Sequence, residues 1–521
     1  MIGSKRGDVT HHIRTIVTHV AHSCNIFAVY CFSLEASMTN KCMVALSLLA
    51  SLAAWPALSW ADGAPDPKAI ISNASKALGA ENLKTIEYSG SGYDFAIGQA
   101  PNPSSPWPKF NDKTYTRAID FDAPASRMQR IRTQGENPPH GGGLQPIVGE
   151  QNQTQVIAPG SPQAATLPDE LMMNVPYGFL KAAASAKDTS AKSQTIGGKK
   201  YTVLSFTAIN KASASGYLND QNLLERVETK IDNTVLGDIP YETTFADYKD
   251  FGGVKFPTHI VQKQGGYPIL DLTVTDVKPN APANIQSAAT PPPAALGSAT
   301  SEKLGDGVYL ILGGYAAVAV DFKEYIVVIE GPQNDQRAEA IIAEAKRVIP
   351  NKPIKYVVNT HQHFDHSGGL RDFVAEGATV ITHQMNKPYY EKIWANPHTL
   401  NPDRLAQNPK KPSFKTMTEK MVLTDGNHVV ELYHLQNFGH NDGMIIAYLP
   451  KERVLLEADG FNPPPQPLTK TPAAISPFTA SLAANIDRVK LDVQRIVPVH
   501  YPADNRKVSM AELQTAVGKG T

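Results

Sequence analysis

Cysteine is almost absent from the chain. Of its 521 residues only three are cysteines, and all lie in the first tenth of the sequence, at Cys24, Cys31 and Cys42. If this first part is cleaved off, as argued below, the remaining chain has neither disulfides nor thiolate metal ligands. Any metal ion would then be held by histidine and carboxylate side chains.

The chain also lacks net charge. Its 49 lysines and arginines balance 49 aspartates and glutamates, which excludes the basic surface of a nucleic-acid-binding protein or a polybasic membrane binder. Neither a G-x-S-x-G nor a Walker A motif occurs, so no serine nucleophile elbow and no P-loop are expected. With 42% hydrophobic and 19% charged residues, the composition predicts a globular protein, and the length predicts two domains.

One long uncharged run stands near the start of the sequence. It covers 42–58, follows Met38 and Lys41, and leads into small residues up to Ala61. This arrangement is typical of a signal peptide over 38–61 and predicts a periplasmic or secreted protein after cleavage near Ala61. The run is short for a transmembrane helix, which needs about 20 residues, so stable membrane anchoring is not expected.

Composition divides the sequence into five parts. They are 1–37, either an atypical leader or an over-extended gene start; 38–61, the signal peptide; 62–278, a β-rich domain; 279–302, an Ala- and Pro-rich linker; and 303–521, an α/β domain.

Residues 62–278 alternate between apolar and polar side chains in several short segments. The segments 223–231 and 270–274 show this period of two, which predicts half-buried strands of an antiparallel sheet. A helix is expected at 67–78, a hairpin turn at Gly252-Gly253, and long loops over 135–176. By pattern alone this part resembles the curved domains of bacterial lipoprotein carriers, in which a helix packs on a sheet. A structural or capping role is favoured over lipid carriage.

Residues 303–521 instead interleave apolar strands with helices, which predicts an α/β domain. Strands are expected at 308–312, 316–320, 326–329, 354–359, 379–382, 429–435, 444–449 and 454–456, and helices at 337–348, 369–375 and 482–491.

A cluster of histidines follows the strand predicted at 354–359. The sequence there reads His361-Gln362-His363-Phe364-Asp365-His366. In an extended segment residues i and i+2 project to the same side, so His361 and His363 can bind one metal ion. Asp365 and His366 fall on the following turn, where they can bind a second ion. Further along the chain, His440, Asp459 and His500 each follow an apolar run, as expected for loops that gather at one sheet edge.

These motifs resemble those of the metallo-β-lactamase superfamily over about 303–521. The resemblance implies an αββα sandwich with His361, His363 and His440 at a first metal site and Asp365, His366 and His500 at a second. It makes Asp459 a bridging ligand, as in glyoxalase II-like dinuclear hydrolases. The zinc β-lactamases of the family usually have another residue there, so Asp459 argues against β-lactam hydrolysis.

The leading hypothesis is a dinuclear zinc hydrolase that cleaves a small-molecule ester, thioester, lactone or amide. Two metal ions can share a water molecule and lower its pKa, and Asp365 is expected to orient that water as the catalytic residue. Alternatives are a mononuclear iron enzyme of the persulfide-dioxygenase kind, a β-lactamase, a nuclease and a non-catalytic binding module. Iron or manganese could replace zinc. No nucleic-acid partner is expected, and the sequence predicts neither substrate-binding residues nor an oligomeric state.

Several other histidines and aromatic residues are expected to support the fold rather than to bind metal or substrate. The histidines His383, His428 and His434 are expected in or beside strands without binding metal. Lys387, Tyr389, Tyr390 and Trp394 are expected to form a packed helix face rather than a substrate pocket, and the proline-rich loop 461–467 is expected to form a stiff wall of the site.

Overall fold

The computed structural model describes residues 65–143, 146–286 and 297–520, all within the compact unit Asp62–Thr521. The predicted leader at 1–37 and the predicted signal peptide at 38–61 lie outside the described residues. Within the described ranges, no helix combines the length and the apolar character needed to cross a membrane.

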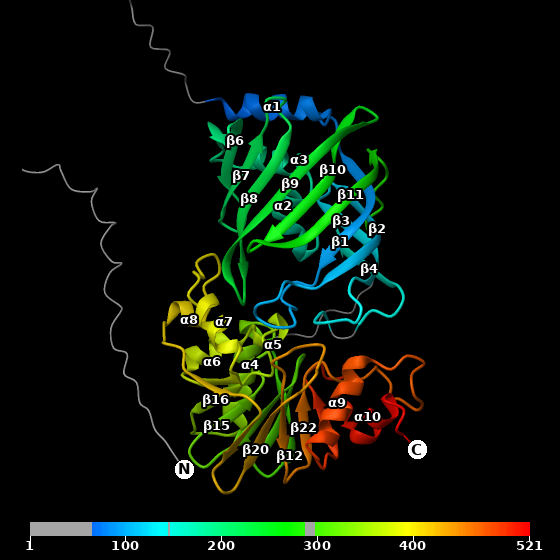
Figure 1. Cartoon of the computed structure of the whole chain (residues 1–521). Helices are drawn as coiled ribbons and strands as arrows, with labels where there is room; N and C mark the ends of the chain where they lie inside the picture. Colours follow the sequence, from blue (N-terminus) through cyan, green and yellow to red (C-terminus); the bar gives the residue numbers. More distant parts are fainter. Residues whose placement is uncertain (1–64, 144–145, 287–296, 521) are drawn as a thin grey trace, which may run out of the picture. The chain divides into compact units, whose positions relative to one another are not determined.

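The N-terminal domain is built on one large antiparallel sheet of eleven strands in the order β4-β3-β2-β1-β11-β10-β9-β8-β7-β6-β5 (Figure 1). The strands are β1 Thr85–Phe95, β2 Lys109–Asp120, β3 Ala125–Gln134, β4 Gln151–Ile157, β5 Ser190–Ile196, β6 Lys199–Thr207, β7 Ser213–Leu218, β8 Leu224–Asn233, β9 Gly237–Phe251, β10 Val254–Gln264 and β11 Tyr267–Pro279. Both strands predicted here are confirmed as parts of β8 and β11. The turn predicted at Gly252-Gly253 joins β9 to β10, and both glycines have the positive φ that such a turn requires.

Three α-helices pack against this sheet: α1 Pro67–Leu78, α2 Leu167–Asn174 and α3 Pro176–Ser185. The helix predicted at 67–78 is confirmed. The side chain of Asp66 caps its first turn, and Gly79 ends it with a φ of 65°. Buried side chains of all three helices, such as Leu78, Leu171 and Phe179, share a core with the sheet.

The interpretation of 135–176 as long loops is wrong in part. The segment contains β4, a short 3₁₀ helix at Pro162–Ala165 and α2. Strand β4 pairs only with β3 and is largely exposed, so its sequence lacks the alternation that marks a half-buried strand. Helix α2 has only eight residues. This is too short for a clear helical period of apolar residues, and the surrounding segment is rich in proline and glutamine, which favoured a loop.

The C-terminal domain contains two sheets. One has seven strands in sequential order, β12 Thr300–Gly305, β13 Val308–Leu312, β14 Ala317–Asp321, β15 Ile326–Ile329, β16 Ile354–Val358, β17 Thr379–His383 and β18 Phe414–Met417. The other has six, β19 Lys420–Thr424, β20 Val429–His434, β21 Ile445–Leu449, β22 Val454–Glu457, β23 Arg495–Pro498 and β24 Val508–Ser509. Strand β12 starts before the domain boundary expected at residue 303, because it pairs with β13.

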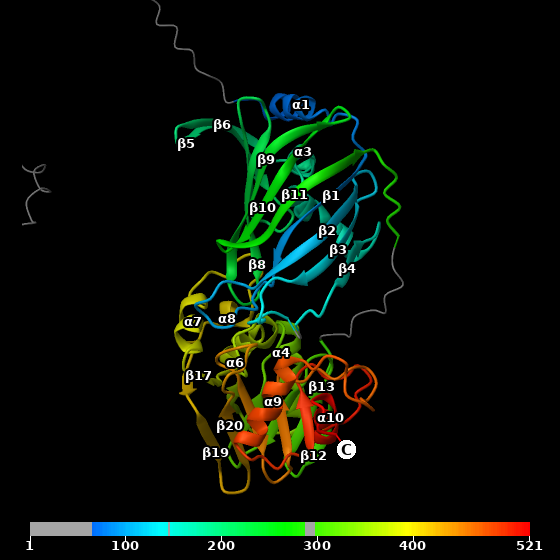
Figure 2. The same cartoon turned by 45° about the vertical axis from the view of Figure 1, so that its right-hand side comes forward.

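Helices cover the outer face of each sheet. They are α4 Asp335–Val348, α5 Phe364–Ser367, α6 Leu370–Glu376, α7 Asn386–Ile393 and α8 Arg404–Gln407 for the first sheet, and α9 Pro477–Arg488 and α10 Met510–Ala516 for the second (Figures 1 and 2). Of the predicted helices, 337–348 and 369–375 are confirmed as α4 and α6. The third, 482–491, overlaps α9, which begins earlier at Pro477 because Ser476 caps it.

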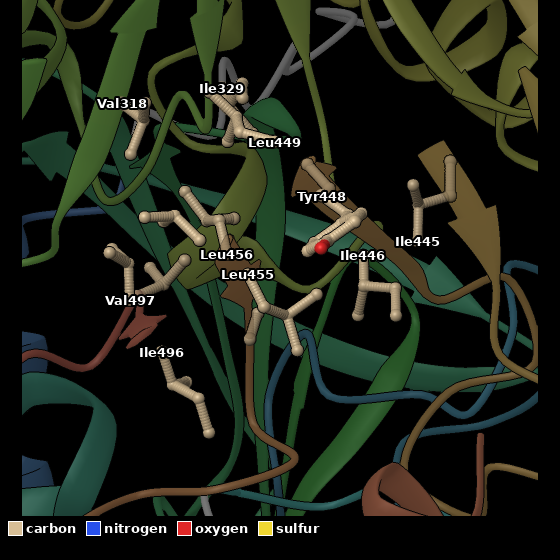
Figure 3. Packing of buried hydrophobic residues seen from close by; sticks show 14 of the residues in the cluster. Val318, Ile329, Ile445, Ile446, Tyr448, Leu449, Leu455, Leu456, Ile496 and Val497 are labelled. Carbon is tan, nitrogen blue, oxygen red and sulfur yellow. The ribbon is translucent and has the colours of Figure 1, made fainter. Parts of the chain in front are cut away.

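Apolar side chains from the two sheets meet in the centre of this domain. Figure 3 shows Val318 and Ile329 of the first sheet close to Leu449, Leu456 and Val497 of the second. A second cluster packs α4 and α6 on the opposite face of the first sheet. The domain is therefore an αββα sandwich, as expected. The strand ends at one edge of this sandwich carry the histidines and aspartates discussed next.

Candidate metal centre

The histidine motif lies between the end of β16 and the short helix α5. His361 and His363 are in the connecting segment, and their ring centroids are 4.4 Å apart. Asp365 and His366 are in the first turn of α5. Since β16 is a buried strand, its carboxyl end fixes where these side chains point.

The structure brings all seven predicted ligands together. Four of them, His361, His363, His440 and Asp459, have potential ligand atoms within 4.8 Å of one another, and so do the other three, Asp365, His366 and His500. The residues come from the ends of β16 and β22, from the loop between β20 and β21, and from the segment after β23.

Asp459 lies between the two groups. Its Oδ2 atom is 3.4 Å from Nε2 of His361, 3.2 Å from Nε2 of His440 and 2.9 Å from Nε2 of His366. Its Oδ1 atom is 2.9 Å from Nε2 of His500. One carboxylate thus faces imidazoles of both groups, which is the geometry of a bridging ligand.

The backbone around Asp459 explains how it reaches this position. Asp459 has a φ of 58°, in the left-handed region. The buried carboxylate of Glu457 accepts hydrogen bonds from the backbone N–H groups of Gly460 and Phe461, at 2.9 and 3.1 Å. These bonds hold the turn after β22 and so stabilise a conformation that a non-glycine residue rarely adopts.

Burial and charge set the protonation of the site. Burial and the neighbouring imidazoles lower the pKa of His361 well below its ordinary value, and burial and His440 lower the pKa of His363 to about 3. Burial alone would raise the pKa of Asp459, but His366, His440 and His500 outweigh it and hold that pKa well below its ordinary value. Burial alone would lower the pKa of His366, but Asp459 and Asp365 outweigh it and raise that pKa well above its ordinary value. The neutral imidazoles of His361 and His363 beside the ionised carboxylate of Asp459 are suitable donors for a divalent cation.

Several buried polar atoms here have no hydrogen-bond partner among the described residues. They are Nε2 of His361, Nδ1 of His363, both ring nitrogens of His440 and Oδ2 of Asp459. Buried polar groups are normally paired, so unpaired atoms on residues whose potential ligand atoms lie within 4.8 Å of one another fit metal ligation. An all-nitrogen-and-oxygen donor set suits zinc, iron or manganese.

Three residues near the ligands were not predicted as site residues. The Tyr315 hydroxyl donates to Oδ2 of Asp365 at 3.0 Å, and its ring packs on His500 with centroids 4.2 Å apart. The fully buried carboxylate of Glu330 lies 3.6 Å from Nδ1 of His366. The side chain of Gln99 donates to Oδ1 of Asp365 at 2.8 Å. None of the three belongs to a recognisable motif. Glu330 alone could have been suspected from the sequence, because a carboxylate directly follows the apolar strand 326–329.

The N-terminal domain reaches the metal centre through the loop between β1 and β2. Besides Gln99, the carbonyl oxygen of Ala100 accepts from Nε2 of His363 at 2.8 Å and from Nε2 of Gln362 at 2.9 Å. Asn102 donates to Asp442, two residues after His440, at 2.8 Å. These contacts join the N-terminal domain to the loops that carry the candidate ligands, and a capping role of this domain stays a prediction.

The residues expected to be structural are separate from the seven ligands. His383 stacks on His434 with ring centroids 4.5 Å apart, and Nε2 of His428 donates to the backbone carbonyl of Asp306 at 2.9 Å. On α7, Tyr390 is buried and stacks on Trp394, which confirms a packed helix face. Tyr389 differs from that expectation, because it lines a cavity.

The fold and the cluster together define an αββα domain with a candidate metal site. The family model of the metallo-beta-lactamase superfamily matches residues 328–500, which include all seven residues. The C-terminal domain of the chain therefore belongs to the metallo-beta-lactamase superfamily, as the motifs indicated. The N-terminal β-rich domain lies outside the matched residues.

Three solved structures illustrate the comparison. A metallo-beta-lactamase from Pontibacter korlensis is 18% identical over 43% of this chain and 98% of its own, with a TM-score of 0.32. The mono-zinc form of metallo-beta-lactamase FIM-1 from Pseudomonas aeruginosa is 16% identical over 43% and 94%, with a TM-score of 0.32. Rubredoxin oxygen:oxidoreductase from Desulfovibrio gigas is 16% identical over 38% and 56%, with a TM-score of 0.30. No curated protein matches the chain. These likenesses carry no information on the reaction.

Proposed function

We propose that the chain is an exported dinuclear zinc hydrolase that cleaves an ester, thioester, lactone or amide bond in a small molecule. The observation that carries this proposal is the position of Asp459, whose Oδ2 atom lies within 3.4 Å of imidazole nitrogens from both ligand groups. A single-ion site has no need of both groups of histidines around this carboxylate.

The seven residues could form two cation-binding sites. His361, His363 and His440 would hold the first, Asp365, His366 and His500 the second, and Asp459 both. When bound, two divalent cations supply Lewis acidity and a water molecule of lowered pKa.

Asp365 is the residue best placed to act on that water. One of its oxygens accepts from Gln99 and the other from Tyr315. Burial would raise its pKa, but the adjacent His366 outweighs this and lowers the pKa below its ordinary value. Asp365 is therefore an oriented, ionised carboxylate that can accept a hydrogen bond from the water and hold it in place.

Exposure indicates the side from which a substrate approaches. The side chains of His361, His366 and His440 are 0% exposed, whereas those of Asp365 and His500 are 28% and 10% exposed. The open side of the cluster is therefore at Asp365 and His500. Tyr315, which contacts both, borders this opening and can position a substrate oxygen there.

A substrate screen with metal analysis tests the function. The purified protein, loaded with zinc, is assayed on phenyl acetate, a lactone, a thioester, a β-lactam and a phosphodiester. We expect about two zinc ions per chain and hydrolysis of at least one ester, thioester or lactone. One tightly bound iron per chain with oxygen consumption and no hydrolysis would favour the oxygenase alternative. Preferential cleavage of the β-lactam or of the phosphodiester would instead favour a β-lactamase or a nuclease.

Export is proposed on the signal-like segment 38–61. Cleavage after Ala61 would remove all three cysteines and leave a chain that begins near Asp62. The intact mass of protein recovered from the periplasm or the medium measures this directly. A mass that retains the cysteines contradicts cleavage at this site without bearing on the hydrolase proposal.

A further inference from the structure

A cavity of about 640 Å³ lies between the N-terminal domain and the metal-binding domain. This volume is within the range of about 300–1,000 Å³ that is typical of small-molecule sites. From the N-terminal domain, the β1–β2 loop and the strand ends near Leu236 and Tyr267 line it. From the metal-binding domain, Gln362, Phe364 and helix α7 line it.

Aromatic side chains from both domains form much of its wall. Trp107 lies with its ring centroid 5.0 Å from that of Tyr267, and 6.1 Å from that of Phe364 in an edge-on arrangement. Tyr389, on α7, adds a fourth ring to the wall. Such rings favour a planar, apolar group between them.

The charge at the cavity is of one sign. Among the described residues that line it, Lys392 is the only charged one. Its side chain is exposed, and no carboxylate in the described part of the chain forms an ion pair with it. An aromatic wall with a single unpaired ammonium group fits a ligand that carries an aryl group and one negative charge.

The cavity wall is also the wall of the metal centre. Gln362 and Phe364, which line the cavity, flank His363, and Ala100, which also lines it, accepts a hydrogen bond from His363. Phe364 directly precedes Asp365, the most exposed of the seven ligands. None of the seven ligands lines the cavity itself, but Gln362, Phe364 and Ala100 join its wall to the segment that carries His363 and Asp365.

Gly98 allows this close approach of the two domains. It has a φ of 74°, and a Cβ atom at this position would lie 2.2 Å from the ring of Phe364. A larger residue would push the β1–β2 loop away from Phe364. The shape of the cavity therefore depends on both domains.

We propose that this cavity binds the aryl-bearing, anionic portion of the substrate, while the bond to be cleaved lies at the metal centre. This inference rests on the proposed hydrolase function and adds its substrate class: aryl-substituted esters, thioesters, lactones or amides with a negative charge remote from the reacting bond. Another cavity, of about 320 Å³, lies within the N-terminal domain around Leu171 and Phe206, and no residue of the metal-binding motif or its neighbours lines it.

Direct binding to the whole chain tests the proposal without hydrolysis. Calorimetric titration with 4-phenylbutanoate should give one site per chain, in metal-free and zinc-loaded protein alike. The neutral 4-phenylbutanamide should bind at least fivefold more weakly. Equal binding of the two probes, or no binding of either, would overturn the proposal.

Two variants locate the site. Lys392→Gln should weaken 4-phenylbutanoate about fivefold and leave the amide unchanged, because the charge lies at a partly solvated rim. Lys387→Gln is the matched control: it is on the same helix, pairs with Glu391 at 3.8 Å and lies outside the cavity. Ser105→Trp, in the lining loop, should weaken both probes by filling the space. If both lysine variants changed the affinity for 4-phenylbutanoate equally, or if Ser105→Trp did not change it, the probe would bind outside this cavity and the proposal would be wrong.

Steady-state kinetics distinguish a failure of the substrate-class proposal from a failure of the hydrolase proposal. On a carboxylate-bearing aryl ester, Lys392→Gln should raise KM about fivefold, while Lys387→Gln leaves KM unchanged. If 4-phenylbutanoate binds as expected and no ester, thioester, lactone or amide is cleaved, the hydrolase function fails and the binding site remains. If such substrates are cleaved but Lys392→Gln alters neither KM nor probe binding, the substrate-class inference fails alone.

Discussion

The imidazole of His363 donates a hydrogen bond from Nε2 to the backbone carbonyl of Ala100, at a distance of 2.8 Å. This bond joins a residue of the metal-binding motif to a loop of the other domain, more than 200 residues away in the sequence. It fixes the ring orientation and the tautomer, so that Nδ1 of His363 is left for a metal ion. Hydrogen-bond partners of this kind orient metal ligands and tune their basicity.

The neighbouring residue Gln99 makes a second contact from this loop, which a substitution can test. Gln99→Ala removes the donor to Oδ1 of Asp365. We expect affinity for the second metal ion to fall about 10-fold, at the lower end of the effect known for such partners. Competition with a chromophoric chelator measures it. Gln155→Ala, on the exposed part of β4, is the control, and an equal loss in both variants would argue against a role of Gln99.

Asp459→Ala tests the bridge between the ligand groups. The carboxylate faces both groups, so its loss should reduce the metal content from about two ions toward one per chain. Hydrolysis should fall about 100-fold, on the scale of removing one group that stabilises developing charge. Elemental analysis and the ester assay measure the two effects. His383→Ala should leave the metal content unchanged, and hydrolysis indifferent to Asp459 would contradict the dinuclear proposal.

Arg337 is fully buried on α4 and donates to backbone carbonyls rather than to a carboxylate. It bonds the carbonyl of Tyr315 at 2.9 and 3.1 Å and that of Ser298 at 3.1 Å. Arg337→Met would remove these hydrogen bonds from a buried site and should lower the free energy of unfolding by about 3 kcal/mol. Urea denaturation measures the loss. Arg347→Met, at the exposed end of the same helix, should change it by less than about 1 kcal/mol.

The same variant should affect the metal centre. Because Arg337 holds the backbone of Tyr315, whose hydroxyl donates to Asp365, activity should fall while the protein is still folded. Full activity of folded Arg337→Met would show that Tyr315 keeps its position without this contact.

Asp112 predicts a pH dependence of stability in the N-terminal domain. Its carboxylate is 2% exposed, and burial together with the nearby Asp94 raises its pKa from 3.8 to about 7. The folded state therefore binds the proton more tightly than the unfolded state. The stability due to this group is fully present below about pH 4 and is lost as the pH rises through about 7.

Asp112→Asn should remove this dependence. The midpoint of thermal unfolding of the variant, relative to the unchanged protein, should increase between pH 4.5 and pH 8.5. A difference of about 1 kcal/mol corresponds to about 2–4 °C for a domain of roughly 200 residues. Asp220→Asn, at an exposed turn, serves as the control and should show a constant difference. A relative midpoint that falls toward high pH would contradict the raised pKa.

Elements whose causes are local could be predicted from the amino-acid sequence. The helix at 67–78 follows from its cap at Asp66 and its stop at Gly79, and the hairpin turn follows from Gly252-Gly253. The seven candidate ligands were also evident, because the spacing of His361 to His366 is short and each remaining ligand follows an apolar run. Local periodicity failed at β4, which is an exposed edge strand with no alternation to detect.

Which distant groups surround the ligands depends on how the folded chain packs and could not be predicted from the sequence. Gln99 and Ala100 come from a loop between two strands of the other domain, and Tyr315 from the segment before β14. Their roles depend on a backbone carbonyl and on single hydrogen bonds between residues far apart in sequence, which leave no spacing to recognise. The same holds for the cavity at Lys392, since its walls exist only where the two domains pack together.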